Sequence, residues 1–171
     1  MNPADPNLPL LESVAHALGP LCDRFVFVGG CVLDVMPTDA NVLGFGNRWY
    51  DVAVRTAELV LLPSGRSIRL IAPPVFLATK LEAFHGRGGG DFLASHDLED
   101  IAVVIDGRPE LVDEVATCEA AQRTYLADEI ESLLRNAAFL EALPGYLPGD
   151  ETGQARLPII RERLRLLTEC G

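Results

Sequence analysis

The chain has few cysteines, and none of them is arranged as metal ligands usually are. Its 171 residues include Cys22, Cys31, Cys118 and Cys170, and no two of these form a C-x-x-C pair. No histidine is placed to complete a ligand pair with them, so the common zinc-binding patterns are excluded. We therefore expect reduced thiols, either buried or free.

Long hydrophobic runs and a basic leader are also lacking. No apolar run reaches about 18 residues, which is the length needed to span a bilayer. The N-terminal stretch MNPADPNLPLLESVAHAL has no basic residue before its apolar part, whereas a secretory signal begins with one. These features predict a cytoplasmic protein that has no membrane as a partner.

Positive charge is scarce as well. Lysine and arginine together number 14 against 25 aspartates and glutamates, for a formal net charge of −11. Broad, unspecific nucleic-acid binding needs a basic surface and is disfavoured, although a local basic cleft stays compatible with this composition. The most basic segment is the last helical pattern, with Arg156, Arg161, Arg163 and Arg165. It either lines such a cleft or is a solvated face that pairs with nearby acids.

Apolar periodicity indicates the elements of the first part of the chain. Hydrophobic residues make up 49% of the sequence, enough for a core in a chain of this length. Helical spacing covers residues 8–18, strands are expected at 24–28 and 31–36, and a hairpin at 58–62 and 67–71. Residues 41–50 read as a loop in which Trp49 either anchors the loop to the core or stacks on a base.

The second part of the chain is predicted to be helical. Two helices joined by a glycine-rich turn follow Pro73, and helical spacing continues from Pro109 to a last helix at 154–167. Pro158 either kinks that helix or marks its start. We expect an α+β fold with a small mixed or antiparallel sheet and flanking helices, organised as a core over 1–107 and a helical C-terminal region over 108–171.

The stretch 73–105 carries the residues most suited to chemistry. Lys80, Ala83 and Arg87 are spaced K-x-x-A-x-x-x-R on one helix face, and Asp97 and Asp100 are spaced D-x-x-D on the next. Cations beside carboxylates suit a metal-bound polyphosphate. Each set of charges also has a structural explanation. Lys80 and Arg87 can form the polar face of an amphipathic helix, and Asp97 and Asp100 can be acids that the helix dipole favours at a helix N-terminus.

These motifs resemble a known family. KLEAFHGR followed by SHDLEDI resembles the third and fourth motifs of the AbiEii-type nucleotidyltransferases, the toxins of certain toxin–antitoxin systems, and FVFVGG at 25–30 matches the strand and Gly-Gly of the first motif. The resemblance implies a polymerase-β-like fold and transfer of a nucleotide from a Mg²⁺-bound NTP to an acceptor such as tRNA. It also implies a cognate antitoxin as a possible partner.

The resemblance assigns roles to individual residues. Those for nucleotide binding are Gly29, Gly30, Lys80 and Arg87. Those for catalysis are Asp34, Asp97 and Asp100, with Asp34 as a ligand of Mg²⁺.

The sequence departs from the family at the second motif, an Asp-x-Asp pair that normally holds the metals. No such pair lies between Gly30 and Val32, where the Gly-Gly directly precedes the next strand. Two strands around Gly-Gly also read as a tight hairpin, because glycine adopts positive φ at no steric cost. The alternative to an active transferase is therefore an inactive remnant that binds a nucleotide or a protein partner.

Overall fold

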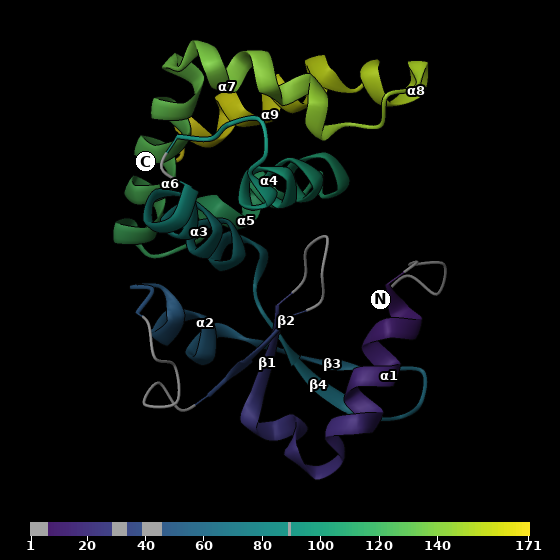
Figure 1. Cartoon of the computed structure of the whole chain (residues 1–171). Coiled ribbons are helices and arrows are strands. Elements are labelled where there is room, and N and C mark those ends of the chain that lie inside the picture. The colour runs from purple at the N-terminus through teal and green to yellow at the C-terminus, as the bar shows by residue number, and fades with distance from the viewer. Residues whose placement is uncertain (1–6, 29–33, 39–45, 89) are drawn as a thin grey trace. The chain divides into compact units, whose positions relative to one another are not determined.

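The computed structural model describes residues 7–28, 34–38, 46–88 and 90–171 of the chain. The chain forms two compact units, Met1–Ala72 and Pro73–Gly171 (Figure 1). The first unit carries the whole described sheet, and the second consists of helices and loops. This mixture agrees with the predicted α+β class.

The N-terminal unit is built on a small mixed sheet. Its strands are β1 (Phe25–Val28), β2 (Asp34–Pro37), β3 (Glu58–Leu61) and β4 (Ser67–Leu70), in the order β2-β1-β4-β3. Strand β1 pairs antiparallel with β2 and parallel with β4, while β3 and β4 pair antiparallel. The prediction of a small sheet that contains two antiparallel pairs is thereby confirmed.

Strands β1 and β2 pair as in the alternative hairpin interpretation of the strands around Gly-Gly, and the predicted hairpin of β3 and β4 is also present. In the first, Phe25 lies opposite Pro37 and Val28 opposite Asp34, whereas Gly29 and Gly30 lie outside the described residues. In the second, the turn between β3 and β4 includes Gly65 at φ 81°, a backbone conformation that glycine adopts without strain. Its amide donates to the carbonyl of Leu62 over 2.9 Å.

Helix α1 (Leu8–Leu18) has the bounds that the apolar spacing predicts. Its residues Leu11 and Ala15 are buried together with Phe27, Leu62 and Ile68 of the sheet region. Gly19, at φ 54°, ends the helix and begins a short 3-10 helix, η1 (Gly19–Arg24). The helix therefore covers one face of the sheet and forms the core of this unit.

Helix α2 (Tyr50–Thr56) was not predicted. It is short, includes the β-branched Val52 and Val54, and has no side-chain N-cap, so it lacks the local signals by which a helix is recognised. Burial of Ala53 holds it in place. Trp49, just before it, is buried and lies under the guanidinium of Arg48, which agrees with the anchoring interpretation.

The C-terminal unit packs its helices around α3 (Pro73–Ala83), most of which is buried. The other helices are α4 (His96–Gly107), α5 (Leu111–Ala116), α6 (Ala120–Arg135), α7 (Ala137–Ala142), α8 (Glu151–Gln154) and α9 (Leu157–Thr168). Helices α4, α5 and α6 each contact α3, and α9 contacts α4, α5 and α6. Thus α3 and α4 belong with the C-terminal helices, and the boundary between units falls before Pro73 rather than after residue 107.

Helix starts in this unit follow local rules. The Ser95 hydroxyl accepts the Leu98 N–H over 3.3 Å and caps α4. Pro158 lies in the first turn of α9, where its missing N–H costs nothing. It therefore marks the start of that helix and does not kink it. Between α7 and α9 the chain forms the 3-10 helix η4 (Leu143–Tyr146) and the short helix α8.

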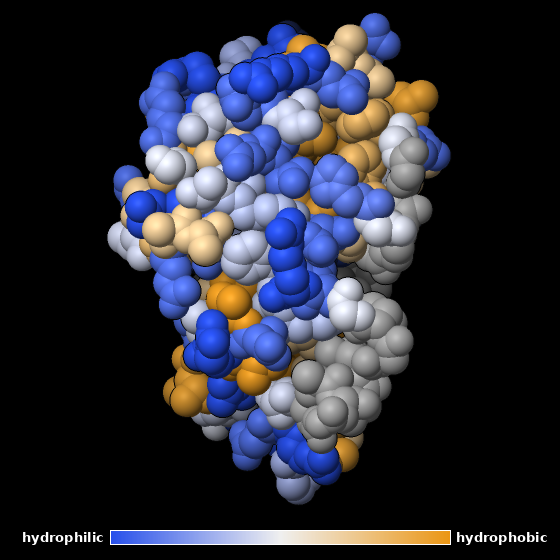
Figure 2. All heavy atoms as spheres, turned by 90° about the vertical axis from the view of Figure 1, so that its left-hand side faces the viewer, coloured by the Kyte–Doolittle hydropathy of each residue, from blue (hydrophilic) through white to orange (hydrophobic). Residues whose placement is uncertain are grey.

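The surface is mostly hydrophilic on the face that Figure 2 shows, where hydrophobic residues emerge only in separate groups. The most exposed large apolar side chains of the described residues include Leu59 and Leu61 on the edge strand β3 and Leu93 before α4. Within the described ranges, no helix has both the length and the apolar character needed to cross a membrane.

Candidate functional site

Lys80, the only lysine in the sequence, lies between two carboxylates. Its Nζ is 2.5 Å from Oδ2 of Asp100 and 3.4 Å from Oδ1 of Asp97. The side chains of Lys80, Asp97 and Asp100 are 16%, 13% and 5% exposed. These three residues, which we call the Lys80 cluster, were predicted as site residues, and the fold brings them together.

Two neighbouring helices position the Lys80 cluster. Lys80 lies in the last turn of α3, and the Ser95 cap places Asp97 and Asp100 in the first turns of α4. A spacing of three residues puts both aspartates on one side of α4, and α4 packs against α3. The cluster therefore depends on tertiary contact between segments 17 residues apart in the chain.

Charge stabilises the protonated form of Lys80. Burial by itself lowers the pKa of the ammonium, but the hydrogen bond and charge of Asp100, joined by those of Asp97, outweigh burial and raise it above 10.5. An ammonium has three N–H donors, of which the two carboxylates take two. Among the described residues no other oxygen accepts from the ammonium, so one donor stays for a further oxygen, although the summed charge of the cluster is −1 when all three groups are ionised.

This pKa shift predicts a change in stability at alkaline pH. Because the folded state raises the pKa of Lys80, the stabilisation from its charge is complete below pH 10.5 and is lost as the pH rises through the folded-state value. We expect the difference in free energy of unfolding between the native chain and Lys80→Met to shrink above that pH. Urea unfolding of both proteins from about pH 8 to about pH 12 measures this difference. A difference that stays constant over the range contradicts the assignment.

Arg87 does not continue the helix face on which it was predicted. Helix α3 ends at Ala83, and Phe84–Gly88 forms a π-helical turn. The α-helical spacing that aligns Arg87 with Lys80 therefore stops before Arg87, and the side chain of Arg87 lies outside the described residues. In the same turn, His85 lies with Nε2 2.5 Å from Oε2 of Glu129.

The remaining predicted site residues belong to the N-terminal unit. Asp34 begins β2 opposite Val28, and its side chain lies outside the described residues, as do Gly29 and Gly30. The structure thus brings Lys80, Asp97 and Asp100 together, whereas the roles predicted for Asp34, Gly29, Gly30 and Arg87 stay predictions.

The Lys80 cluster is a poor fit to Mg²⁺ as it stands. Both carboxylates face the ammonium of Lys80, which repels a divalent cation, whereas Mg²⁺ needs oxygen ligands around it. In the described segments, no group of three or more His, Cys, Asp or Glu residues could hold a metal ion. These residues therefore support no metal-dependent catalytic step.

The arginines of the last helical region are largely engaged within the unit. Arg156 Nε lies 2.7 Å from Asp106, Arg163 donates to the carbonyls of Ile105 and Asp106, and Arg165 pairs with Glu162 and Glu169. This arrangement favours the interpretation of a face paired with nearby acids over a nucleic-acid cleft. The role of Arg163 at the end of α4 was missed, because the sequence does not reveal that α9 passes that helix end.

Tyr146 anchors the segment before α4. Its hydroxyl donates to the carbonyl of Phe92, and the Phe92 ring packs 5.3 Å from that of Phe84, measured between centroids. Burial, with the charges of Asp91 and Glu99, raises the pKa of Tyr146 to about 12, so the phenol stays protonated and can donate at neutral pH. The loop that leads to Ser95 and the aspartates is thereby anchored at Phe92.

The chain matches no model of a protein family, no curated protein and no solved structure. The functional proposal therefore rests on the geometry of the Lys80 cluster and on the motifs in the sequence.

Proposed function

We propose that the chain is a nucleotidyltransferase-like protein that binds an NTP and transfers a nucleotide to an acceptor such as tRNA. The observation that supports this is the Lys80 cluster, in which a lysine of K-x-x-A spacing meets both aspartates of D-x-x-D across α3 and α4. The same motifs carry the resemblance to the AbiEii-type toxins. On that basis the protein is cytoplasmic and has an antitoxin as a partner.

The members of the cluster have different roles in this proposal. Asp100, which is nearly buried and 2.5 Å from Nζ, positions Lys80 by restricting a long and flexible side chain. The remaining N–H of Lys80 binds a phosphate oxygen. Asp97 lies farther away at 3.4 Å and is more exposed, which makes it the carboxylate that can accept a proton from an acceptor hydroxyl. Phosphate binding by Gly29, Gly30 and Arg87 stays a prediction, as does metal binding by Asp34.

A second candidate is an inactive remnant that binds a nucleotide or a protein without transfer. Two observations favour it. The sequence has no Asp-x-Asp pair after Gly30, and both carboxylates of the cluster are already engaged by Lys80. A two-metal mechanism needs carboxylates that are free to bridge the ions.

A transfer assay separates these candidates. The chain is incubated with Mg²⁺, each α-labelled NTP in turn and a total tRNA pool, beside the variants Asp97→Asn and Arg161→Gln. We expect label on the RNA that falls by at least about tenfold in Asp97→Asn, because a general base contributes about 10²–10⁴ in rate. Exposed Arg161 serves as the control, and its replacement leaves the signal unchanged.

Acetylation of Lys80 reports nucleotide binding in the same samples. Lys80 and the N-terminal amine are the amines available in the chain, because the sequence has no other lysine. We expect an NTP to slow acetylation of Lys80 and not that of the N-terminus, as read by peptide mass. Protection without transfer indicates the inactive binding protein. If the chain shows neither protection nor transfer, both the transferase and the nucleotide-binding remnant are rejected.

A further inference from the structure

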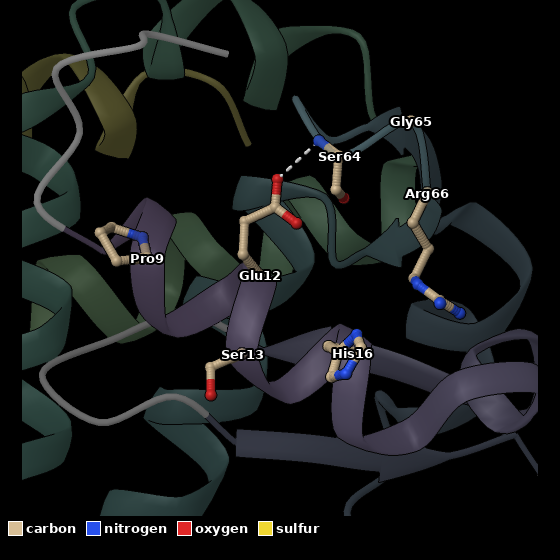
Figure 3. Close-up of a pocket in the computed structure, with 7 residues that line it drawn as sticks. All are labelled: Pro9, Glu12, Ser13, His16, Ser64, Gly65 and Arg66. Atoms are coloured by element: carbon tan, nitrogen blue, oxygen red, sulfur yellow. Dashed lines mark hydrogen bonds between the residues drawn. The ribbon is translucent and has the colours of Figure 1, made fainter.

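The N-terminal unit has a polar pocket far in sequence from the Lys80 cluster. It lies between α1 and the turn that joins β3 to β4, with Glu12 and His16 on the helix and Ser64 and Arg66 on the turn (Figure 3). Its volume of about 770 Å³ falls in the range of small-molecule sites, about 300–1,000 Å³. The pocket belongs entirely to one unit.

The walls of the pocket are tied together on both sides. Oε1 of Glu12 accepts the N–H of Ser64 over 2.9 Å, and Nη1 of Arg66 donates to the carbonyl of Gly19 over 2.9 Å. Figure 3 shows Glu12 reaching from α1 to the backbone of Ser64, while Arg66 extends from the turn beside the helix. Since the buried face of α1 packs on the sheet, both walls are held before any ligand arrives, which reduces the cost of binding.

The charges of the pocket select the ligand. Arg66 has no carboxylate within salt-bridge distance among the described residues, and Gly19 takes only one of the five N–H donors of its guanidinium. The exposed imidazole of His16 and the hydroxyl of Ser64 line the same space. Arginine binds carboxylate and phosphate oxygens in a forked geometry. Glu12 keeps a second oxygen, which can accept from a hydroxyl or amine of the same ligand.

We infer that this pocket binds a small polar molecule through a phosphate or carboxylate group, with Arg66 and His16 holding the anion and Glu12 a donor group of the ligand. A protein of net charge −11 repels anions over most of its surface. Arg66, which has no carboxylate partner among the described residues and lies in a pocket whose walls are tied together, is therefore where a small anion would be retained. The inference is independent of the Lys80 cluster and of nucleotide transfer.

The test is a titration of the ¹⁵N-labelled full chain with inorganic phosphate and, separately, with acetate. We expect saturable shifts of the Ser64, Gly65 and Arg66 amides with at least one of the two anions, and the better anion identifies the ligand group. Arg66→Gln should weaken binding by at least about tenfold, the loss expected for a charge-assisted contact. Arg161→Gln, which removes an exposed arginine from the other unit, should leave binding unchanged.

A second variant keeps the test decisive if Arg66→Gln disturbs the turn. The side chain of His16 is exposed, so His16→Gln should fold normally and still weaken binding severalfold. The inference is overturned if neither anion gives a saturable shift at the pocket amides. It is also overturned if His16→Gln binds as the native chain does, or if Arg66→Gln and Arg161→Gln weaken binding equally.

Discussion

Replacing Lys80 with methionine is expected to lower the free energy of unfolding by about 3 kcal/mol, because it removes one partner of a largely buried ion pair. Asp100 is 5% exposed and loses the ammonium that lies 2.5 Å away. Methionine fills much of the space of the lysine stem, so the loss reports charge more than packing. Urea unfolding followed by circular dichroism at neutral pH measures the change.

A companion variant separates the unpaired charge from other effects. Lys80→Met combined with Asp100→Leu removes the nearly buried carboxylate together with the ammonium and keeps the more exposed Asp97. Since apolar replacement of a buried ion pair is often neutral, we expect the double variant to recover most of the lost stability. Arg161→Met, at an exposed position of α9, should change stability by less than about 0.5 kcal/mol. If the single variant unfolds like the native chain, the buried ion pair does not exist as described.

Phe27→Ala is expected to cost about 3–5 kcal/mol, the usual range for a large buried aromatic residue. Phe27 is 0% exposed in the centre of β1 and packs in the core formed by α1 and the sheet. Its loss leaves a cavity between α1 and the sheet, which costs the contacts that Phe27 makes there. Urea unfolding again measures the change, with loss of the Phe25–Val28 amide protection in hydrogen exchange as a local report.

Leu59→Ala is the matched control for Phe27→Ala. Leu59 lies on the same sheet, yet it is 73% exposed on the edge strand β3. Removing its side chain should change the free energy of unfolding by less than about 0.5 kcal/mol. Equal losses for the two variants would falsify the placement of the core between α1 and β1.

Local patterns predicted the elements whose residues carry their own signals. The bounds of α1 follow from apolar spacing ended by Gly19-Pro20, the β3–β4 hairpin from two apolar strands around Gly65, and the start of α4 from the Ser95 cap. Each of these signals acts over a few residues, through dihedral preference or one hydrogen bond. They need no knowledge of what lies elsewhere in the chain.

Part of the candidate site was also accessible from the sequence. The spacings K-x-x-A and D-x-x-D place each set of charges on one side of a helix. The resemblance supplied the further expectation that the two helices meet, and the fold places Lys80 against Asp97 and Asp100. For Arg87 the spacing rule assumes an unbroken α-helix, whereas a π-helical turn begins at Phe84, and the side chain of Arg87 lies outside the described residues.

By itself, then, the sequence determined the class of the fold, most helix and hairpin positions and the two charged helix faces, because backbone preference and side-chain periodicity are local. Only the tertiary structure decided that α3 and α4 pack with the C-terminal helices, that Ala53 is buried and holds α2, and that Arg156 and Arg163 bind the end of α4. It also decided that Arg66 borders a pocket beside α1. The physical reason is that these features depend on which surfaces bury one another, and that choice is made by the whole core at once.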